Sequence, residues 1–324
     1  MRRSRSGLVL GISLAIVVAL AADPADARRR GHRHHQARAE RIVPPLTADG
    51  LPNIRSVSAL AVDMDTGNIV YGKNPDAVRA IASTGKIYVA LVARRRGIEL
   101  EGITEMTMDD VRFARGGSRT HLDVGQRFRN HDLLRAMLIA SDNRAVTAVG
   151  RAVGLGPEQL VREMNDLARD LGLQHTHFVD PTGLNGNWSS ARDMAVALTA
   201  ALRDPVLAEI LTTRFASIHN VSEGRIRTIN YANTNHVLHR NGLHVLGGKT
   251  GYTHEAGYCL VTGVEMGGRR LAFVFLGGDG ELTRFADFNR LAGWMELGRG
   301  GGGVATDVAV GGSVMRAQKT EDSR

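Results

Sequence analysis

The alternation of apolar and polar residues predicts β-strands near both ends of the body of this chain. Residues 58–65 and 68–73 are rich in Ala, Val and Ile and meet at a Thr-Gly pair, which is typical of a hairpin. A clearer hairpin is predicted from residues 257–265 and 269–277, which flank a Gly-Gly turn. Residues 244–250 predict one more strand just before it.

Between these strands, apolar residues recur at helical spacing. Residues 133–140 predict a compact apolar helix, and residues 157–171 predict a longer one that begins at a proline and is followed by a glycine. A Ser-x-x-Asp start, which resembles a capping box, precedes a third helix over 194–202. Aromatic and apolar residues over 285–295 predict a last amphipathic helix.

The order of the predicted elements, with strands first, helices next and strands again at the end, predicts an α/β (α+β) fold with one antiparallel sheet built from both ends of the chain. Helices should flank the sheet, and a helical subdomain of about residues 100–235 should be inserted between its halves. We therefore expect one domain over 55–297, with its site in the cleft between sheet and helices. Residues 298–324 form a Gly-rich polar tail.

The composition of the 324 residues, 43% apolar and 23% charged, is that of a globular protein. A single cysteine, Cys259, excludes an intrachain disulfide framework and any cysteine-cluster metal site. The net charge is +8, but residues 28–41 alone hold six Arg and one Glu, a net of +5. The basic character thus belongs largely to a short segment, and no nucleic-acid partner is expected.

The N-terminus has the layout of a signal peptide over residues 1–27. Three arginines precede a nearly uncharged stretch over 7–22, and Ala-Asp-Ala at 25–27 resembles a cleavage site. An uncleaved membrane anchor is the alternative. We expect an exported protein of the periplasm or cell envelope, not an integral membrane protein. Residues 28–54 would be a basic, disordered arm, with electrostatic contact to anionic envelope polymers as a further hypothesis.

Lysine is rare in this chain, with four among 41 basic residues, so each lysine is a candidate functional residue. Unlike arginine, a lysine can lose its proton when it is desolvated or placed near another cation. Lys86 lies three residues after Ser83, a spacing that puts both on one helix face. A neutral Lys86 amine can therefore take the Ser83 proton as the hydroxyl attacks a carbonyl.

Two further segments fit the same chemistry. In Ser141-Asp142-Asn143, the serine can relay a proton and Asn143 can orient an amide. Lys249 would disfavour a charge on Lys86 and attract an anionic substrate. Gly251, two residues later, would let a substrate approach a sheet edge closely.

The motifs Ser-x-x-Lys, Ser-x-Asn and Lys-Thr-Gly each occur once, in that order, an arrangement known from penicillin-binding proteins and class A β-lactamases. Together with residues 62–67, 178–184 and 233–236, they resemble the D-alanyl-D-alanine carboxypeptidase family of low-mass penicillin-binding proteins. The similarity runs from about residue 55 to about 296. Asn143-Arg144-Ala145 and the Asn-Thr-Asn-His run at 233–236 are most similar to the penicillin-binding protein 7 branch of DD-endopeptidases.

This resemblance implies a β-lactamase/transpeptidase-like fold and a serine-type D-alanyl-D-alanine peptidase. Ser83 matches the acylated nucleophile and Lys86 its general base, while Ser141 and Asn143 match the second motif. The partners implied are peptidoglycan stem peptides and β-lactam antibiotics. No metal or organic cofactor is implied.

The resemblance also implies substrate-binding residues at the other end of the chain. Lys249 and Thr250 match the motif that binds the carboxylate of a substrate or β-lactam. The backbone N–H of Tyr252, with that of the nucleophile, would form the oxyanion hole. Arg284 matches an arginine that holds the substrate carboxylate.

Two positions depart from the family pattern. Gly85 replaces a threonine common in relatives and would weaken a helix interior, and Arg144 replaces an aspartate common in the carboxypeptidase branch. Two functions other than a D-alanyl peptidase stay open. One alternative is a serine β-lactamase of the same fold. The other is a catalytically weak homologue that binds muropeptides without cleaving them.

Overall fold

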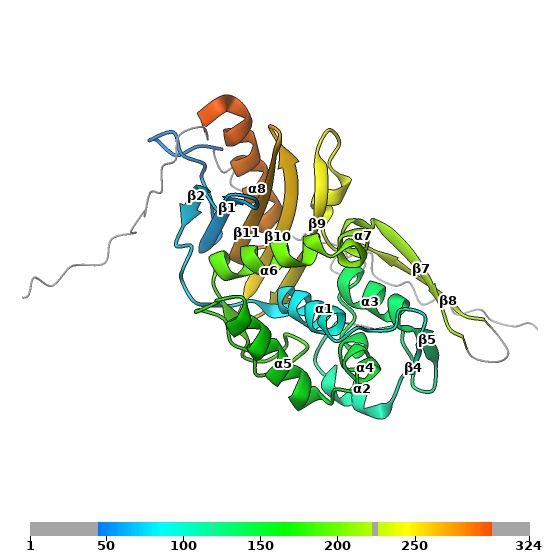
Figure 1. Ribbon diagram of the computed structural model, residues 1–324. Helices are drawn as coiled ribbons and strands as arrows, with labels where there is room; N and C mark the ends of the chain where they lie inside the picture. The colour runs from blue at the N-terminus through cyan, green and yellow to red at the C-terminus, as the bar shows by residue number, and fades with distance from the viewer. Residues whose placement is uncertain (1–44, 119, 222–225, 300–324) are drawn as a thin grey trace, which may run out of the picture. The chain divides into compact units, whose positions relative to one another are not determined.

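The computed structural model describes residues 45–118, 120–221 and 226–299 (Figure 1). The predicted signal peptide, most of the basic arm and nearly all of the Gly-rich tail lie outside the described residues. None of the described helices is both long enough and apolar enough to cross a membrane.

A five-stranded antiparallel sheet forms the centre of the described domain, in the order β2-β1-β11-β10-β9 (Figure 1). Its strands are β1 (Ser58–Asp63), β2 (Ile69–Lys73), β9 (His244–Thr253), β10 (Gly257–Met266) and β11 (Arg269–Gly278). The N-terminal hairpin joins the sheet where β1 pairs with β11, from Ser58 opposite Leu276 to Asp63 opposite Leu271. The prediction of one antiparallel sheet built from both ends of the chain is confirmed.

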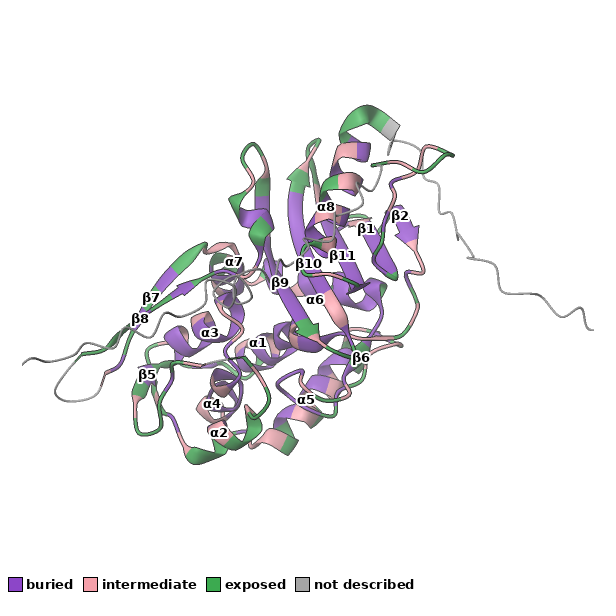
Figure 2. Cartoon of the chain, turned by 180° about the vertical axis from the view of Figure 1, so that it is seen from behind, coloured by how far each residue is buried: buried purple, intermediate pink, exposed green. Residues whose placement is uncertain are grey.

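Helices cover both faces of this sheet, and alternate residues of β11 show how. Ala272, Val274 and Leu276 point into a core shared with α6 (Ala191–Arg203). The side chains between them join a second core beneath α8 (Thr283–Trp294), on the opposite face. Both sets of residues are buried, and Figure 2 shows β11 largely in the colour of buried residues. A strand buried on both sides loses the apolar–polar alternation of a surface strand, which explains its nearly continuous apolar sequence.

The segment inserted between the two halves of the sheet is mostly helical, as predicted. Its helices are α1 (Lys86–Arg95), α2 (Met108–Phe113), α3 (Asn130–Ile139), α4 (Arg144–Ala152), α5 (Pro157–Asp170), α6 and α7 (Pro205–Thr212). Short strands, which we did not predict, pair as β3 (Arg79–Ala80) with β6 (Trp188–Ser189), β4 (Ile103–Glu105) with β5 (Arg127–Arg129), and β7 (Phe215–His219) with β8 (Thr228–Ala232). The short 3-10 turns η1 (Ala82–Gly85) and η2 (His236–His239) and the π-helical segment η3 (Met295–Arg299) complete the elements.

The packed domain begins earlier than residue 55, where we expected the arm to end. Leu46 bridges to Pro52, and Ile54 is buried in the core beneath α8. The Trp294 indole N–H donates to the Gly50 carbonyl at 3.1 Å. Residues 45–54 therefore form part of the domain rather than of the arm.

Candidate active site

Ser83 sits on a short 3-10 turn, η1, that leads directly into α1. Ala82, just before it, has a φ of +48°, an unusual left-handed conformation for a residue with a side chain. Such conformations persist only where the surrounding structure enforces them. Here the bend leaves Ser83 half-buried at the base of a cleft, with Lys86 one turn further on as the first residue of α1.

The Lys86 amine is the centre of the site. Its Nζ donates to Ser83 Oγ at 2.6 Å and to Asn143 Oδ1 at 2.6 Å, and it lies 3.4 Å from Ser141 Oγ. The side chain is fully buried, and this burial lowers the pKa of Lys86 to about 7. The carboxylates of Asp142 and Asp180 partly oppose that shift. A substantial fraction of the amine is thus neutral near pH 7, as a general base requires.

The Ser141–Asn143 segment connects α3 to α4 and faces the amine. Ser141 has a φ of +63°, a second left-handed residue beside the reacting groups. Between the two site residues, the buried Asp142 points the other way. Its carboxylate accepts from Thr120 Oγ1 at 2.6 Å and from the Arg144 backbone N–H at 2.9 Å. Asp142 therefore holds the bend that turns its two neighbours toward Lys86.

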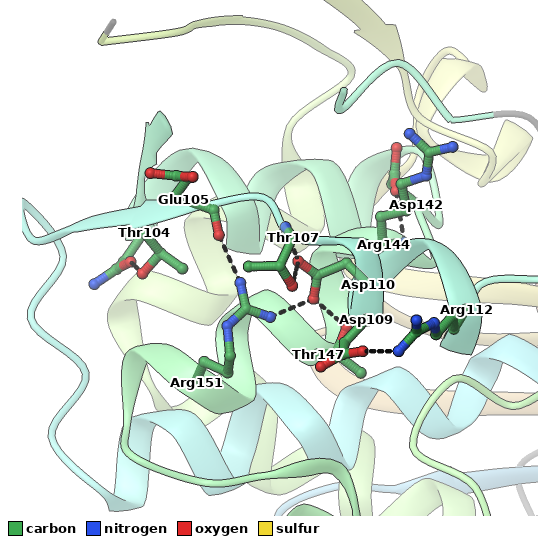
Figure 3. A network of polar contacts seen from close by, with 11 residues as sticks. Thr104, Glu105, Thr107, Asp109, Asp110, Arg112, Asp142, Arg144, Thr147 and Arg151 are labelled. Atoms are coloured by element: carbon green, nitrogen blue, oxygen red, sulfur yellow. Dashed lines mark hydrogen bonds and ion pairs between the residues drawn. The ribbon is translucent and has the colours of Figure 1, made fainter. Parts of the chain in front are cut away.

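A buried carboxylate on α2 fixes this helix to α4, which begins directly after Asn143 (Figure 3). Asp110 accepts from the Thr107 backbone N–H at 2.7 Å, from Thr147 Oγ1 at 2.5 Å and from the Arg151 guanidinium. Its neighbours satisfy this buried charge, as a stable interior requires. The network also anchors the loop after α2, whose residues 115–118 form one wall of the cleft.

Strand β9 brings the Lys-Thr-Gly segment against the Ser83 turn. A Cβ placed on Gly251 would lie 2.9 Å from the Ser83 backbone nitrogen, so only glycine allows this approach. Lys249 is buried, and its Nζ donates to the Thr250 carbonyl at 2.9 Å. Burial holds the pKa of Lys249 well below its usual value, and the charges of Lys86 and Arg284 act in the same direction.

Arg284, from α8, reaches the same strand. Its Nη1 lies 3.5 Å from the Gly251 carbonyl oxygen, and its guanidinium lies 5.0 Å from the Tyr258 ring centre and 4.8 Å from that of Phe285. The stacking holds a planar cation at the cleft without a carboxylate partner among the described residues. Tyr252 is half exposed and stacks on Tyr258, with ring centres 4.2 Å apart.

The predicted residues surround one cleft of about 850 Å³. Those that line it are Ser83, Ser141, Asn143, Thr250, Gly251, Tyr252 and Arg284. Lys86 and Lys249 lie just behind this surface, buried and bonded to it. The structure thus brings every predicted site residue into one place.

Several cleft residues carried no role in our sequence interpretation. Arg115 and Leu184 line the cleft from loops, and Thr234 accepts a hydrogen bond from Thr250 Oγ1 at 2.6 Å. The Asn-Thr-Asn-His run contained a signal for Thr234. For Arg115, by contrast, one exposed arginine among many gives no signal in the sequence.

The concern about Gly85 needs correction, because Gly85 is not in a helix interior. It closes the η1 turn just before α1, with an ordinary helical φ of −60°. An added Cβ would meet ring and methyl carbons at 3.4–3.5 Å, which is normal contact. The 2.6 Å Ser83–Lys86 contact shows no loosened turn. As for Arg144, its Nη1 donates to the Leu122 carbonyl at 2.6 Å, away from the reacting groups.

Comparison with known proteins places this geometry in a family. The family model for D-alanyl-D-alanine carboxypeptidase, peptidase S11, matches residues 46–280. The chain is 33% identical over 257 residues to a D-alanyl-D-alanine endopeptidase of Escherichia coli (strain K12), covering 78% of this chain and 81% of the relative. It is 34% identical over 260 residues to a Pseudomonas aeruginosa protein of the same name, covering 79% and 83%.

A solved structure agrees with these sequence matches. The crystal structure of the Streptomyces K15 DD-transpeptidase superposes with a TM-score of 0.72 at 27% identity, covering 76% of this chain and 98% of that one. The β-lactamase/transpeptidase-like fold predicted from the motifs is therefore confirmed. With most of its described residues matched by the family model, the chain belongs to the D-alanyl-D-alanine carboxypeptidase family of serine peptidases, S11.

Proposed function

We propose that this protein hydrolyses D-alanyl peptide bonds in peptidoglycan peptides through an acyl-enzyme on Ser83, and that penicillin acylates the same residue. The observation that carries this proposal is the 2.6 Å contact between the buried Lys86 amine and the Ser83 hydroxyl, at the base of a cleft that can hold a peptide. Family membership supports the reaction class.

In the first step, Ser83 Oγ attacks the D-alanyl carbonyl carbon while its proton passes to the neutral Lys86 Nζ. The backbone N–H groups of Ser83 and Tyr252 would stabilise the oxyanion of the tetrahedral intermediate. As the amide C–N bond breaks, the proton reaches the leaving amine through Lys86 and Ser141, which leaves an ester on Ser83. Water then attacks the ester carbonyl while Lys86 takes one of its protons, and Lys86 passes this proton to Ser83 Oγ as the ester C–O bond breaks, which releases the acid and restores the free serine.

The substrate carboxylate would bind at the opposite wall of the cleft. Thr250 and Arg284 offer it a hydroxyl and a guanidinium, and Lys249 lies behind them. An anion bound here would favour the charged form of Lys249, whose pKa burial otherwise lowers. This wall would therefore recognise a peptide chain end or a β-lactam carboxylate.

We further propose that cross-linked peptides are the preferred substrate, because both relatives reported above are named endopeptidases. The protein would act in the cell envelope after export directed by residues 1–27, with residues 28–41 giving electrostatic contact with anionic polymers. The proposed chemistry needs no metal or organic cofactor.

Digestion of purified muropeptides tests the proposal, with product masses as the readout. Conversion of cross-linked dimers to monomers would support endopeptidase action, and loss of a terminal D-Ala would support carboxypeptidase action. A stable penicillin adduct on the Ser83 peptide is expected in parallel. Rapid penicillin turnover without an adduct would instead indicate a β-lactamase, and muropeptide binding without products would indicate a non-catalytic homologue.

The rate of penicillin acylation should rise with pH and reach half its maximum near pH 7. Lys86 must be neutral to accept the Ser83 proton, and its pKa is about 7. Below that value the amine is protonated, so the rate should fall about tenfold for each pH unit. Stopped-flow measurement with a fluorescent penicillin from pH 5 to 9 checks this.

The matched variant is Asp142→Asn. The negative charge of Asp142 raises the pKa of Lys86, so its removal should move the midpoint of the pH profile to lower pH. The amide keeps an acceptor for the Arg144 N–H, so the bend should survive. A midpoint that stays in place or moves to higher pH would contradict this assignment of the base.

A further inference from the structure

A second groove, of about 570 Å³, opens beside the catalytic cleft. The end of α2, the first turns of α5 and the loop before β6 form its walls. Arg115 and Asn185 line both the groove and the cleft, so the two hollows adjoin. A peptide that occupies the cleft and extends past these two residues would enter the groove.

The groove is rich in cationic groups. Arg112, Arg115 and Arg162 all contribute to its lining, and all three are exposed. Arg112 pairs with Asp109 at 2.9 Å. Within the part of the chain that the structure describes, Arg115 and Arg162 have no carboxylate partner. Two guanidinium groups are therefore available to an incoming anion.

Two carboxylates also belong to the lining, but one of them is already satisfied. Asp180 is buried, and its Oδ2 accepts from Thr182 Oγ1 at 2.7 Å and from the Leu184 backbone N–H at 2.7 Å. Its charge is thus bonded within its own loop. Glu158 is the acidic group that remains against the three arginines, so the groove has a positive balance.

Apolar side chains lie among these cations. Phe113 is 41% exposed and Val179 is 51% exposed, although both are large hydrophobic residues, and Val161 also lines the groove. Apolar contact and guanidinium groups together suit a peptide that carries carboxylates beside aliphatic side chains. A neutral glycan would leave the arginines without partners.

We propose that this groove binds a carboxylate-bearing peptide segment of the substrate, beyond the residues that lie at Ser83. The inference rests on the proposed function and adds a substrate feature to it. It differs from the carboxylate site at Arg284, which lies on α8 and takes no part in the groove. Arg162 is the clearest determinant, because it lines the groove and not the catalytic cleft.

The test compares two peptides of equal length with the same D-alanyl scissile bond. One carries free side-chain carboxylates away from that bond, and in the other these groups are carboxamides. Arg162→Glu should raise KM for the carboxylate peptide about three- to fivefold, within the size expected for an exposed ion pair, with kcat unchanged. KM for the carboxamide peptide should change less than about twofold, and Arg162→Lys should keep most of the affinity.

Arg203→Glu serves as the charge control, since Arg203 is exposed but lines neither hollow. It should leave both KM values unchanged. An equal rise of KM for both peptides in Arg162→Glu, or no rise for either, would overturn the groove assignment. Penicillin acylation separates the two hypotheses. Wild-type protein that never forms the Ser83 adduct refutes the proposed function. Normal acylation, together with an Arg162→Glu effect on KM that is the same for both peptides, refutes the groove assignment alone.

Discussion

Replacement of Ser83 by alanine is expected to lower kcat/KM on D-alanyl peptides by about 10⁴-fold or more and to abolish the penicillin adduct. The reason is that covalent catalysis needs the Ser83 hydroxyl, which is the group that Lys86 contacts at 2.6 Å in the cleft. Without that hydroxyl, binding and the remaining cleft residues can give only a small residual rate. Kinetics on a D-alanyl peptide and intact-protein mass after penicillin treatment measure both effects.

Ser118→Ala is the matched control, because Ser118 is a second serine that lines the cleft, from the loop after α2. This variant should still gain the mass of one penicillin. Thermal unfolding of Ser83→Ala should stay close to that of the wild type, since the substitution removes one half-buried hydroxyl. A Ser83→Ala protein that still forms the adduct would place the nucleophile elsewhere.

The main sheet could be predicted because its signals are local. The strands of both hairpins carry β-branched and apolar residues up to glycine-containing turns, and these turns fix which strands pair. The site could be located because its chemistry depends on rare residues at fixed spacing, above all Lys86 and Lys249 in an arginine-rich chain. Their meeting in space follows from the pairing of β1 with β11, which brings the two ends of the chain together.

Other features depend on tertiary packing and have little or no signal in the local sequence. Ala82 and Ser141 adopt left-handed conformations without being glycine, so no propensity indicates the bends that aim Ser83 and Asn143. Strands β7 and β8 have five residues each, of which only two per strand are buried, so their apolar signal in the sequence is short and weak. The cationic groove likewise arises because α2 and α5 lie beside one loop, although they are distant in sequence.

Gly183→Ala should destabilise the protein by about 2–4 kcal/mol and lower Tm by about 5–15 °C. Gly183 has a φ of +84°, which already disfavours alanine, and an added Cβ would lie 2.4 Å from the Ala82 carbonyl oxygen and 3.0 Å from the Ser83 backbone nitrogen. These are backbone atoms of the nucleophile turn, which cannot rotate away as a side chain would. Relief of the clash should move Ser83 relative to Lys86, so the penicillin acylation rate should fall as well.

Gly172→Ala separates the two causes, because Gly172 has nearly the same φ, +72°, and nothing within 4 Å of an added Cβ. This control should show only the conformational cost of about 1 kcal/mol, with acylation unchanged. The extra loss of stability in Gly183→Ala, relative to Gly172→Ala, then measures how tightly the loop over 180–185 packs on the Ser83 turn. Equal losses of stability in the two variants, with acylation intact in both, would show that this loop does not position the nucleophile.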